Sequence, residues 1–133
     1  MLLEGIDHIV LTVRDVDATC EFYAQVLGME VRTTPLTGRK ALHFGHHKIN
    51  LHQAGHEFSP KAQAPTPGAA DFCLLTTTPL TQVMARIQGC GVEIIEGPVP
   101  RLGARGTMVS VYFHDPDGNL VEVANLLDDT QPV

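Results

Sequence analysis

Four polar residues lie within or beside short apolar runs, and their types suit the binding of a divalent metal ion. They are His8 before Ile9-Val10-Leu11, Asn50 between Ile49 and Leu51, Asp71 before Phe72-Cys73-Leu74, and Glu122 between Val121 and Val123. Imidazole nitrogen and amide or carboxylate oxygen are common ligands of such ions, and a bound ion polarises a substrate oxygen. His52 follows Asn50 by two residues, so in a strand it shares the same face.

Each of these residues also has a structural interpretation. A histidine in a strand can be held by hydrogen bonds alone, and an aspartate at a strand start often caps a turn. Glu122 alternates with Val121 and Val123, so it faces away from the side on which the valines pack. If that side faces solvent, Glu122 is an ordinary strand residue. If it lines a cavity, Glu122 is a ligand or a base.

The clearest structural element is the segment that carries Glu122. Two runs rich in β-branched and aromatic residues, 109–113 and 120–123, flank Asp115-Pro116-Asp117-Gly118. Proline fixes φ and glycine accepts a positive φ, so this sequence predicts a hairpin with a tight turn.

The chain predicts the order β-α-β-β-β twice, in modules 5–56 and 69–127, joined by a proline-rich linker at 57–68. In the first module the expected strands are 6–13, 29–33, 40–45 and 48–53, with a helix from Asp15 or Asp17 to Gly28. In the second, the expected strands are 70–76, 92–95 and the two of the hairpin, with a helix capped by Thr78 and a loop at 97–106. Overlaying the modules matches His8 with Asp71, and Asn50 with Glu122.

Composition limits the classes of function. The chain has 133 residues, a formal charge of -6 and a pI near 5.5, which disfavours nucleic acid and acidic membranes as partners. Cys20, Cys73 and Cys90 form neither an even set nor a C-x-x-C pair, so we expect a reducing compartment and no disulfide framework. Without a signal peptide pattern or a long apolar run, the expected location is the cytoplasm.

Several motifs together resemble the vicinal oxygen chelate superfamily, which includes glyoxalase I, fosfomycin and bleomycin resistance proteins and extradiol dioxygenases. Within this superfamily, the chain looks most like small single-chain glyoxalase domain-containing proteins, including virulence-associated members of bacteria. The motifs are Asp7-His8, Phe22-Tyr23, Val26-Leu27-Gly28-Met29-Glu30-Val31, Ile49-Asn50-Leu51-His52, Glu96-Gly97-Pro98-Val99 and Asp115-Pro116-Asp117-Gly118-Asn119-Leu120-Val121-Glu122. The resemblance implies an α+β fold of paired βαβββ modules whose curved mixed sheets surround a cleft. It also implies a homodimer and a divalent metal ion.

The resemblance also implies roles for the polar residues. His8 and Glu122 match the first and last metal ligands of the family, with Glu122 also a candidate proton acceptor. Asn50 stands where glyoxalase I has a carboxylate, and Asp71 where many members have histidine. His52 replaces Asn50 as ligand if the strand shifts. A neutral amide cannot accept a proton from carbon at neutral pH, so Asn50 argues against the glyoxalase I reaction itself.

The implied function is a lyase or isomerase that uses nickel, zinc, manganese or iron on a small oxygenated substrate. Two alternatives stay open. One is a metal-free protein of the bleomycin-resistance type that sequesters a small ligand. The other is an extradiol-type dioxygenase, which needs a facial triad such as His8, His52 and Glu122.

Further polar residues have simpler expected roles. His43, His46 and His47 resemble a metal site by number, but their place near a hairpin tip predicts a solvated turn. His114 precedes the tight turn and is expected at the surface. Arg101 and Arg105 are expected in a solvated loop, from which they could contact an anionic substrate.

Overall fold

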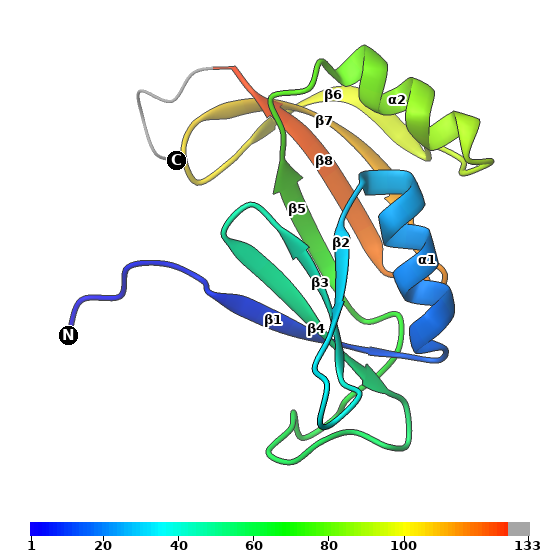
Figure 1. Cartoon of the computed structure of the whole chain (residues 1–133). Coiled ribbons are helices and arrows are strands. Elements are labelled where there is room, and N and C mark those ends of the chain that lie inside the picture. Colours follow the sequence, from blue (N-terminus) through cyan, green and yellow to red (C-terminus); the bar gives the residue numbers. More distant parts are fainter. Residues whose placement is uncertain (128–133) are drawn as a thin grey trace. The chain divides into compact units, whose positions relative to one another are not determined.

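A computed structural model describes residues 1–127 of the chain (Figure 1). The chain divides into two compact units, of which the first is Met1–Ala69 and the second begins at Ala70. Each unit contains one helix and one four-stranded mixed sheet. The α+β class and the repeated β-α-β-β-β order are therefore confirmed.

In the first unit, β1 pairs in parallel with β4, which continues antiparallel through β3 to β2. The elements are β1 (His8–Val13), α1 (Val16–Leu27), β2 (Glu30–Thr33), β3 (Lys40–Phe44) and β4 (His47–Gln53). Strand β1 begins at His8, two residues later than expected, because His8 is the first residue with a partner on β4.

The second unit repeats this topology, with sheet order β5-β8-β7-β6 and a parallel pairing of β5 with β8. The elements are β5 (Asp71–Leu75), α2 (Leu80–Gly89), β6 (Glu96–Leu102), β7 (Thr107–His114) and β8 (Leu120–Leu126). Figure 1 shows the two units in chain order, the first coloured blue to green and the second green to red.

The core of each unit lies between its helix and one face of its sheet. Strand alternation places apolar residues on that face and polar residues on the other. In the first unit Tyr23 of α1 and Leu42 of β3 are fully buried, and in the second Ile87 of α2 and Val111 of β7 are. The opposite face of each sheet is left to the candidate site residues.

Helix α1 begins and ends where the sequence predicts. The side chain of Asp15 accepts a hydrogen bond from the Ala18 amide at 3.0 Å, and Gly28 ends the helix with φ 71°. Of the two predicted caps, Asp15 and not Asp17 is therefore used.

The predicted cap of α2 by Thr78 is wrong. The N-cap is Pro79, which has no side-chain capping bond, and Asn125 of β8 supplies the acceptor to Leu80 N at 3.0 Å. The amide nitrogen of Asn125 also donates to the carbonyls of Thr76 and Thr78. A partner 45 residues away cannot be recognised from a local capping pattern.

The first unit uses the same device. Gln53, at the end of β4, accepts from Val16 N at 3.2 Å and donates to the Arg14 carbonyl. Gln53 and Asn125 each follow the matched residues Asn50 and Glu122 by three positions. The repeat therefore extends to an amide side chain that fastens the turn between first strand and helix.

The expected strand at 92–95 and the loop at 97–106 are wrong. Residues Glu96–Leu102 form β6 instead, although they include Pro98 and Pro100. Strand β6 is at the edge of its sheet, where a missing N–H can face solvent, and its register with β7 shifts between Glu96 and Val99.

The Asp-Pro-Asp-Gly turn is confirmed and is held internally. Asp115 Oδ1 accepts from the amides of Asp117 and Asn119, and Gly118 has φ 88°. The buried Asn119 side chain then accepts from Ala70 N at 2.9 Å. The turn thereby ties β8 to the start of β5 and fixes the position of Glu122.

Candidate functional site

The polar face of the first sheet carries His8, Asn50 and His52. Asn50 is paired with Val10, two positions along β1 from His8, whereas His52 is paired with Thr12, four positions along. At about 3.3 Å per residue the offsets from His8 are about 7 and 13 Å. Asn50 is therefore better placed than His52 to share a ligand with His8.

His8 is oriented by its neighbour Asp7. The Asp7 Oδ1 atom lies 2.7 Å from His8 Nδ1, and since the carboxylate only accepts, Nδ1 carries the proton. This hydrogen bond is the main cause that lowers the pKa of Asp7. The Nε2 atom is left as an acceptor, the arrangement common among metal-binding histidines.

His52 is committed to a different contact. Its ring packs edge-on against Phe58 with centroids 5.4 Å apart, and the Arg39 guanidinium lies 3.7 Å above the same Phe58 ring. These contacts attach the segment after β4 to the sheet. Packing of this kind gives His52 a structural role.

In the second unit Glu122 is the centre of a polar cluster on three adjacent strands. Ser110 Oγ of β7 donates to Glu122 Oε2 at 2.5 Å. The backbone partners of Glu122 are Cys73 on β5 and Tyr112 on β7. Glu122 therefore faces other polar side chains, which the alternation of its strand predicts but does not identify.

Two groups around Glu122 stay protonated at neutral pH. Desolvation, followed by the Glu122 charge and hydrogen bond, raises the pKa of Cys73 to about 12. Desolvation also raises the pKa of Tyr112, against the hydrogen bond from Arg101 Nε to its hydroxyl at 2.9 Å. Both groups can therefore donate a hydrogen bond to Glu122.

Arg101 completes this cluster. Its Nη2 atom lies 3.5 Å from Glu96 Oε1, so β6 carries a linked pair beside Tyr112. The sequence did not predict this position of Arg101, because it assigned residues 97–106 to a loop, whereas Arg101 belongs to strand β6. Ser110 and Tyr112 were missed because their types suggest packing or solvation, and only the strand register places them around Glu122. Arg101 was considered only as a loop residue that could contact an anionic substrate.

Asp71 lies at the start of β5 and is exposed. It is paired with Leu120 and stands two positions from Cys73, the partner of Glu122. Asp71 and Glu122 are therefore diagonal neighbours on one face, as His8 and Asn50 are in the other unit.

The donors thus fall into one pair in each unit. Within residues 1–127 no three or more His, Cys, Asp and Glu side chains come together as a metal site. The imidazole nitrogen and the amide and carboxylate oxygens nevertheless fit a divalent ion by type. In addition, His8 and Glu122 are each oriented by a neighbouring hydrogen bond, as metal ligands usually are.

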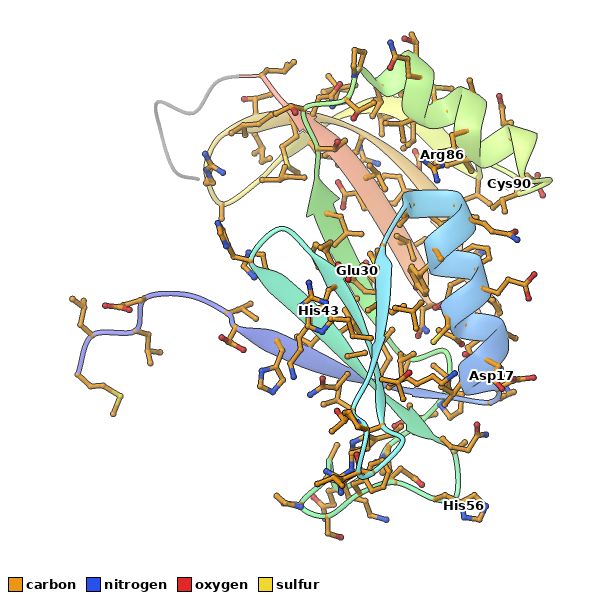
Figure 2. The ribbon with its side chains drawn as sticks, in the orientation of Figure 1. Asp17, Glu30, His43, His56, Arg86 and Cys90 are labelled. Atoms are coloured by element: carbon orange, nitrogen blue, oxygen red, sulfur yellow. The ribbon has the colours of Figure 1, made fainter. Side chains whose placement is uncertain are left out.

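The sequence singled out four further histidines, three at or near the hairpin between β3 and β4 and one at the end of β7. His46 is exposed in the hairpin turn, and His114 is exposed before the tight turn, as predicted. His47 is also exposed, but it is the first residue of β4, and its Nδ1 atom lies 3.0 Å from the Ile6 carbonyl oxygen. His43 differs, because it lies on β3 and is half-buried. Its side chain is next to Glu30 of β2 (Figure 2).

Residues 5–123 match the profile of the Glyoxalase/Bleomycin resistance protein/Dioxygenase superfamily. Virulence protein STM3117 of Salmonella typhimurium is 52% identical over 124 residues, covering 93% of this chain and 85% of that protein. Its crystal structure superposes with a TM-score of 0.93, covering 96% of this chain and 100% of the other. Glyoxalase domain-containing protein RDO1 of Mycosarcoma maydis is 44% identical, covering 95% and 70%.

Structures of lower identity share the fold. Lactoylglutathione lyase from Agrobacterium tumefaciens has a TM-score of 0.70 at 23% identity, covering 92% of this chain and 94% of the other. The fosfomycin resistance protein FosX from Listeria monocytogenes, solved with Mn(II), has a TM-score of 0.66 at 21% identity. The match covers 94% of this chain and 92% of the other. TnmS3, an antibiotic binding protein from Streptomyces, has a TM-score of 0.73 at 20% identity. The match covers 95% of this chain and 98% of the other.

No helix within residues 1–127 is long and apolar enough to span a bilayer. The profile match covers most of the chain, two relatives are 44% and 52% identical to it, and the crystal structure of the relative at 52% superposes closely. The chain belongs to the glyoxalase/bleomycin resistance protein/dioxygenase superfamily.

Proposed function

We propose that this protein is a divalent-metal-dependent lyase or isomerase acting on a small oxygenated substrate. His8, Asn50, Asp71 and Glu122 would hold the ion, which as a Lewis acid stabilises an oxyanion of the substrate. One observation carries the proposal: the first and the last candidate ligand along the chain are each oriented by a hydrogen bond. Asp7 orients His8, and Ser110 orients Glu122.

The residues around Glu122 suit proton transfer on a bound substrate. Glu122 is the carboxylate of the cluster and acts as the proton acceptor. Tyr112 and Cys73 stay protonated beside Glu122, so they add no second negative charge to the cluster. Ser110 Oγ fixes Oε2, so Oε1 is the oxygen left to face the substrate.

Sequestration of a small ligand without metal is the second candidate. Two observations favour it: Asn50 is neutral, and the ammonium-bearing Lys48 is the direct strand partner of His8. A cation beside a ligand opposes the binding of a second cation. TnmS3, which shares the fold, is an antibiotic binding protein.

Ring cleavage by an extradiol-type dioxygenase is less well supported. It requires two histidines and one carboxylate around iron. His52 is about 13 Å along the strands from His8 and packs on Phe58, so it is poorly placed as the second histidine.

Metal content and thermal stability separate the two main candidates. The protein is purified without a polyhistidine tag or chelators and measured by elemental analysis, then heated with nickel, zinc, manganese or iron added. The lyase proposal predicts near-stoichiometric metal and a higher melting temperature with the correct ion. Substoichiometric metal with no stabilisation by any of the four would support sequestration instead.

A further inference from the structure

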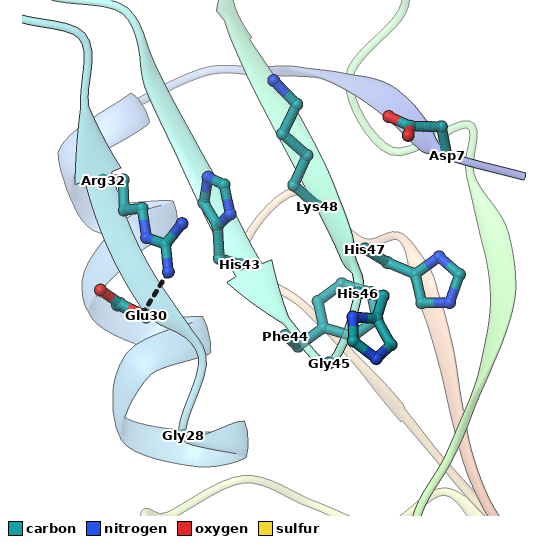
Figure 3. Close-up of a pocket in the computed structure, with 10 residues that line it drawn as sticks. All are labelled: Asp7, Gly28, Glu30, Arg32, His43, Phe44, Gly45, His46, His47 and Lys48. Atoms are coloured by element: carbon teal, nitrogen blue, oxygen red, sulfur yellow. Dashed lines mark hydrogen bonds and ion pairs between the residues drawn. The ribbon is translucent and has the colours of Figure 1, made fainter.

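A polar pocket lies at one end of the first sheet, outside the Glu122 cluster (Figure 3). Its volume is about 490 Å³, within the range of small-molecule sites. Its charged side chains are those of Asp7, Glu30, Arg32 and Lys48, and His43 lies among them. All belong to the first unit, so the pocket does not depend on any other part of the chain.

The strand register explains how these side chains meet. Glu30 of β2, His43 of β3 and Lys48 of β4 form a row of direct partners across three strands. Figure 3 shows Arg32, His43 and Lys48 on the same side of these strands. The strand pairing of the sheet therefore fixes this row of side chains.

The two carboxylates of the pocket are already engaged. Glu30 Oε2 lies 3.0 Å from Arg32 Nη2, and Asp7 Oδ1 contacts His8. Lys48 is half-buried, and outside the strand ladder its ammonium group forms no hydrogen bond or ion pair with any residue between 1 and 127. Its ammonium group is thus the uncommitted charge of the pocket.

The electrostatic effect on His43 also indicates positive charge in this pocket. Desolvation and the charges of Arg32 and Lys48 lower the pKa of His43, and the nearby Glu30 opposes them only in part. An anion placed between Lys48 and His43 would relieve this repulsion. It would also accept hydrogen bonds from the remaining guanidinium N–H groups of Arg32.

We propose that this pocket binds the phosphate or carboxylate group of a small molecule, with Lys48 as the main charge partner and Arg32 and His43 as hydrogen-bond donors. Because Lys48 is the strand partner of His8, an anchored anion would lie beside the metal ligands. This last step rests on the proposed function, and it specifies the substrate as a small molecule that carries an anionic group.

The test is a titration of the metal-free, full-length protein with inorganic phosphate, and separately with acetate, followed by amide chemical shifts. We expect saturable millimolar binding that shifts residues 43–48, and about a tenfold loss of affinity in Lys48→Gln. Lys48→Arg should restore most of it. Lys40→Gln is the matched control, since Lys40 pairs with Asp17 and does not line the pocket.

Shifts spread uniformly over the surface, or equal affinity in wild type and Lys48→Gln, would overturn the proposal. Repeating the titration with Glu122→Gln separates it from the metal question. Anion binding that survives in this variant supports the pocket even if metal binding fails. If Glu122→Gln abolished the local shifts, the anion would be held elsewhere and the Lys48 assignment would be wrong.

Discussion

The protonation of Cys73 provides a sharp test of the Glu122 cluster. Cys73 is exposed by its accessible surface, and an exposed cysteine normally reacts readily with alkylating reagents. Here desolvation, and then the Glu122 carboxylate, raises its pKa from 9.0 to about 12. At pH 8 the thiolate fraction should therefore be about a thousandfold lower than for an unperturbed thiol.

Replacing Glu122 by glutamine removes the charge but keeps the shape of the side chain. Since desolvation is the larger cause, the pKa of Cys73 should fall only part of the way towards 9.0. A fall of one unit would raise the thiolate fraction, and hence the alkylation rate, about tenfold at pH 8. Glu96→Gln is the control, because Glu96 contacts Arg101 and is not a cause of the Cys73 shift.

The assay is alkylation by iodoacetamide between pH 7 and 11, with each cysteine followed by peptide mass spectrometry. The same peptide in unfolded protein gives the unperturbed rate. A native Cys73 that reacts as fast as the unfolded one at pH 8, or a rate unchanged in Glu122→Gln, would refute the reasoning. The raised pKa of Cys73 also makes the stability of the fold depend on pH. Its contribution to the free energy of unfolding is fully present below about pH 9 and is lost as the pH rises towards 12.

Three further predictions concern the fold and the assembly. Gly97→Ala should cost more than about 2 kcal/mol in chemical unfolding, since Gly97 has φ 111° and a Cβ there would meet the Ser110 carbonyl oxygen and lie 2.9 Å from Val111 Cα. Gly89→Ala, with nothing within 4 Å, is its control and should be neutral or stabilising. A short insertion after Gln63 should cost less than about 1 kcal/mol, and a large fall in melting temperature would show instead that this segment is packed. We also expect a homodimer by light scattering at micromolar concentration, because each sheet ends in open edge strands; a monomer would contradict this.

The sequence predicted the elements whose signals are local. The Asp15 cap, the Gly28 stop and the Asp-Pro-Asp-Gly turn all depend on residues within a few positions of one another, and all three are confirmed. The cap of α2 failed for the opposite reason. Asn125, which binds Leu80 N, is brought there only by the folding of β8 beside β5.

The site shows the same division. Strand periodicity and the internal repeat placed Glu122 on the face opposite its two valines, and the structure surrounds it there with Ser110 and Tyr112. Neither of those residues has a sequence pattern that marks it as functional. Arg101 was assigned to a loop because Pro98 and Pro100 suggest one, and only an edge position in the sheet makes a strand there acceptable.

Calorimetric titration of the divalent ion into wild type and Glu122→Gln tests the central proposal most directly. If His8 and Glu122 share one ion, Glu122→Gln and His8→Ala should each abolish tight binding. The double variant should be little worse than either single one, because ligands of one ion act as a unit. Asn50→Ala should weaken binding less, since water can replace a neutral donor, and Glu96→Gln should leave it unchanged. Full metal occupancy in Glu122→Gln would make Glu122 a structural residue of β8 and contradict the proposed lyase or isomerase.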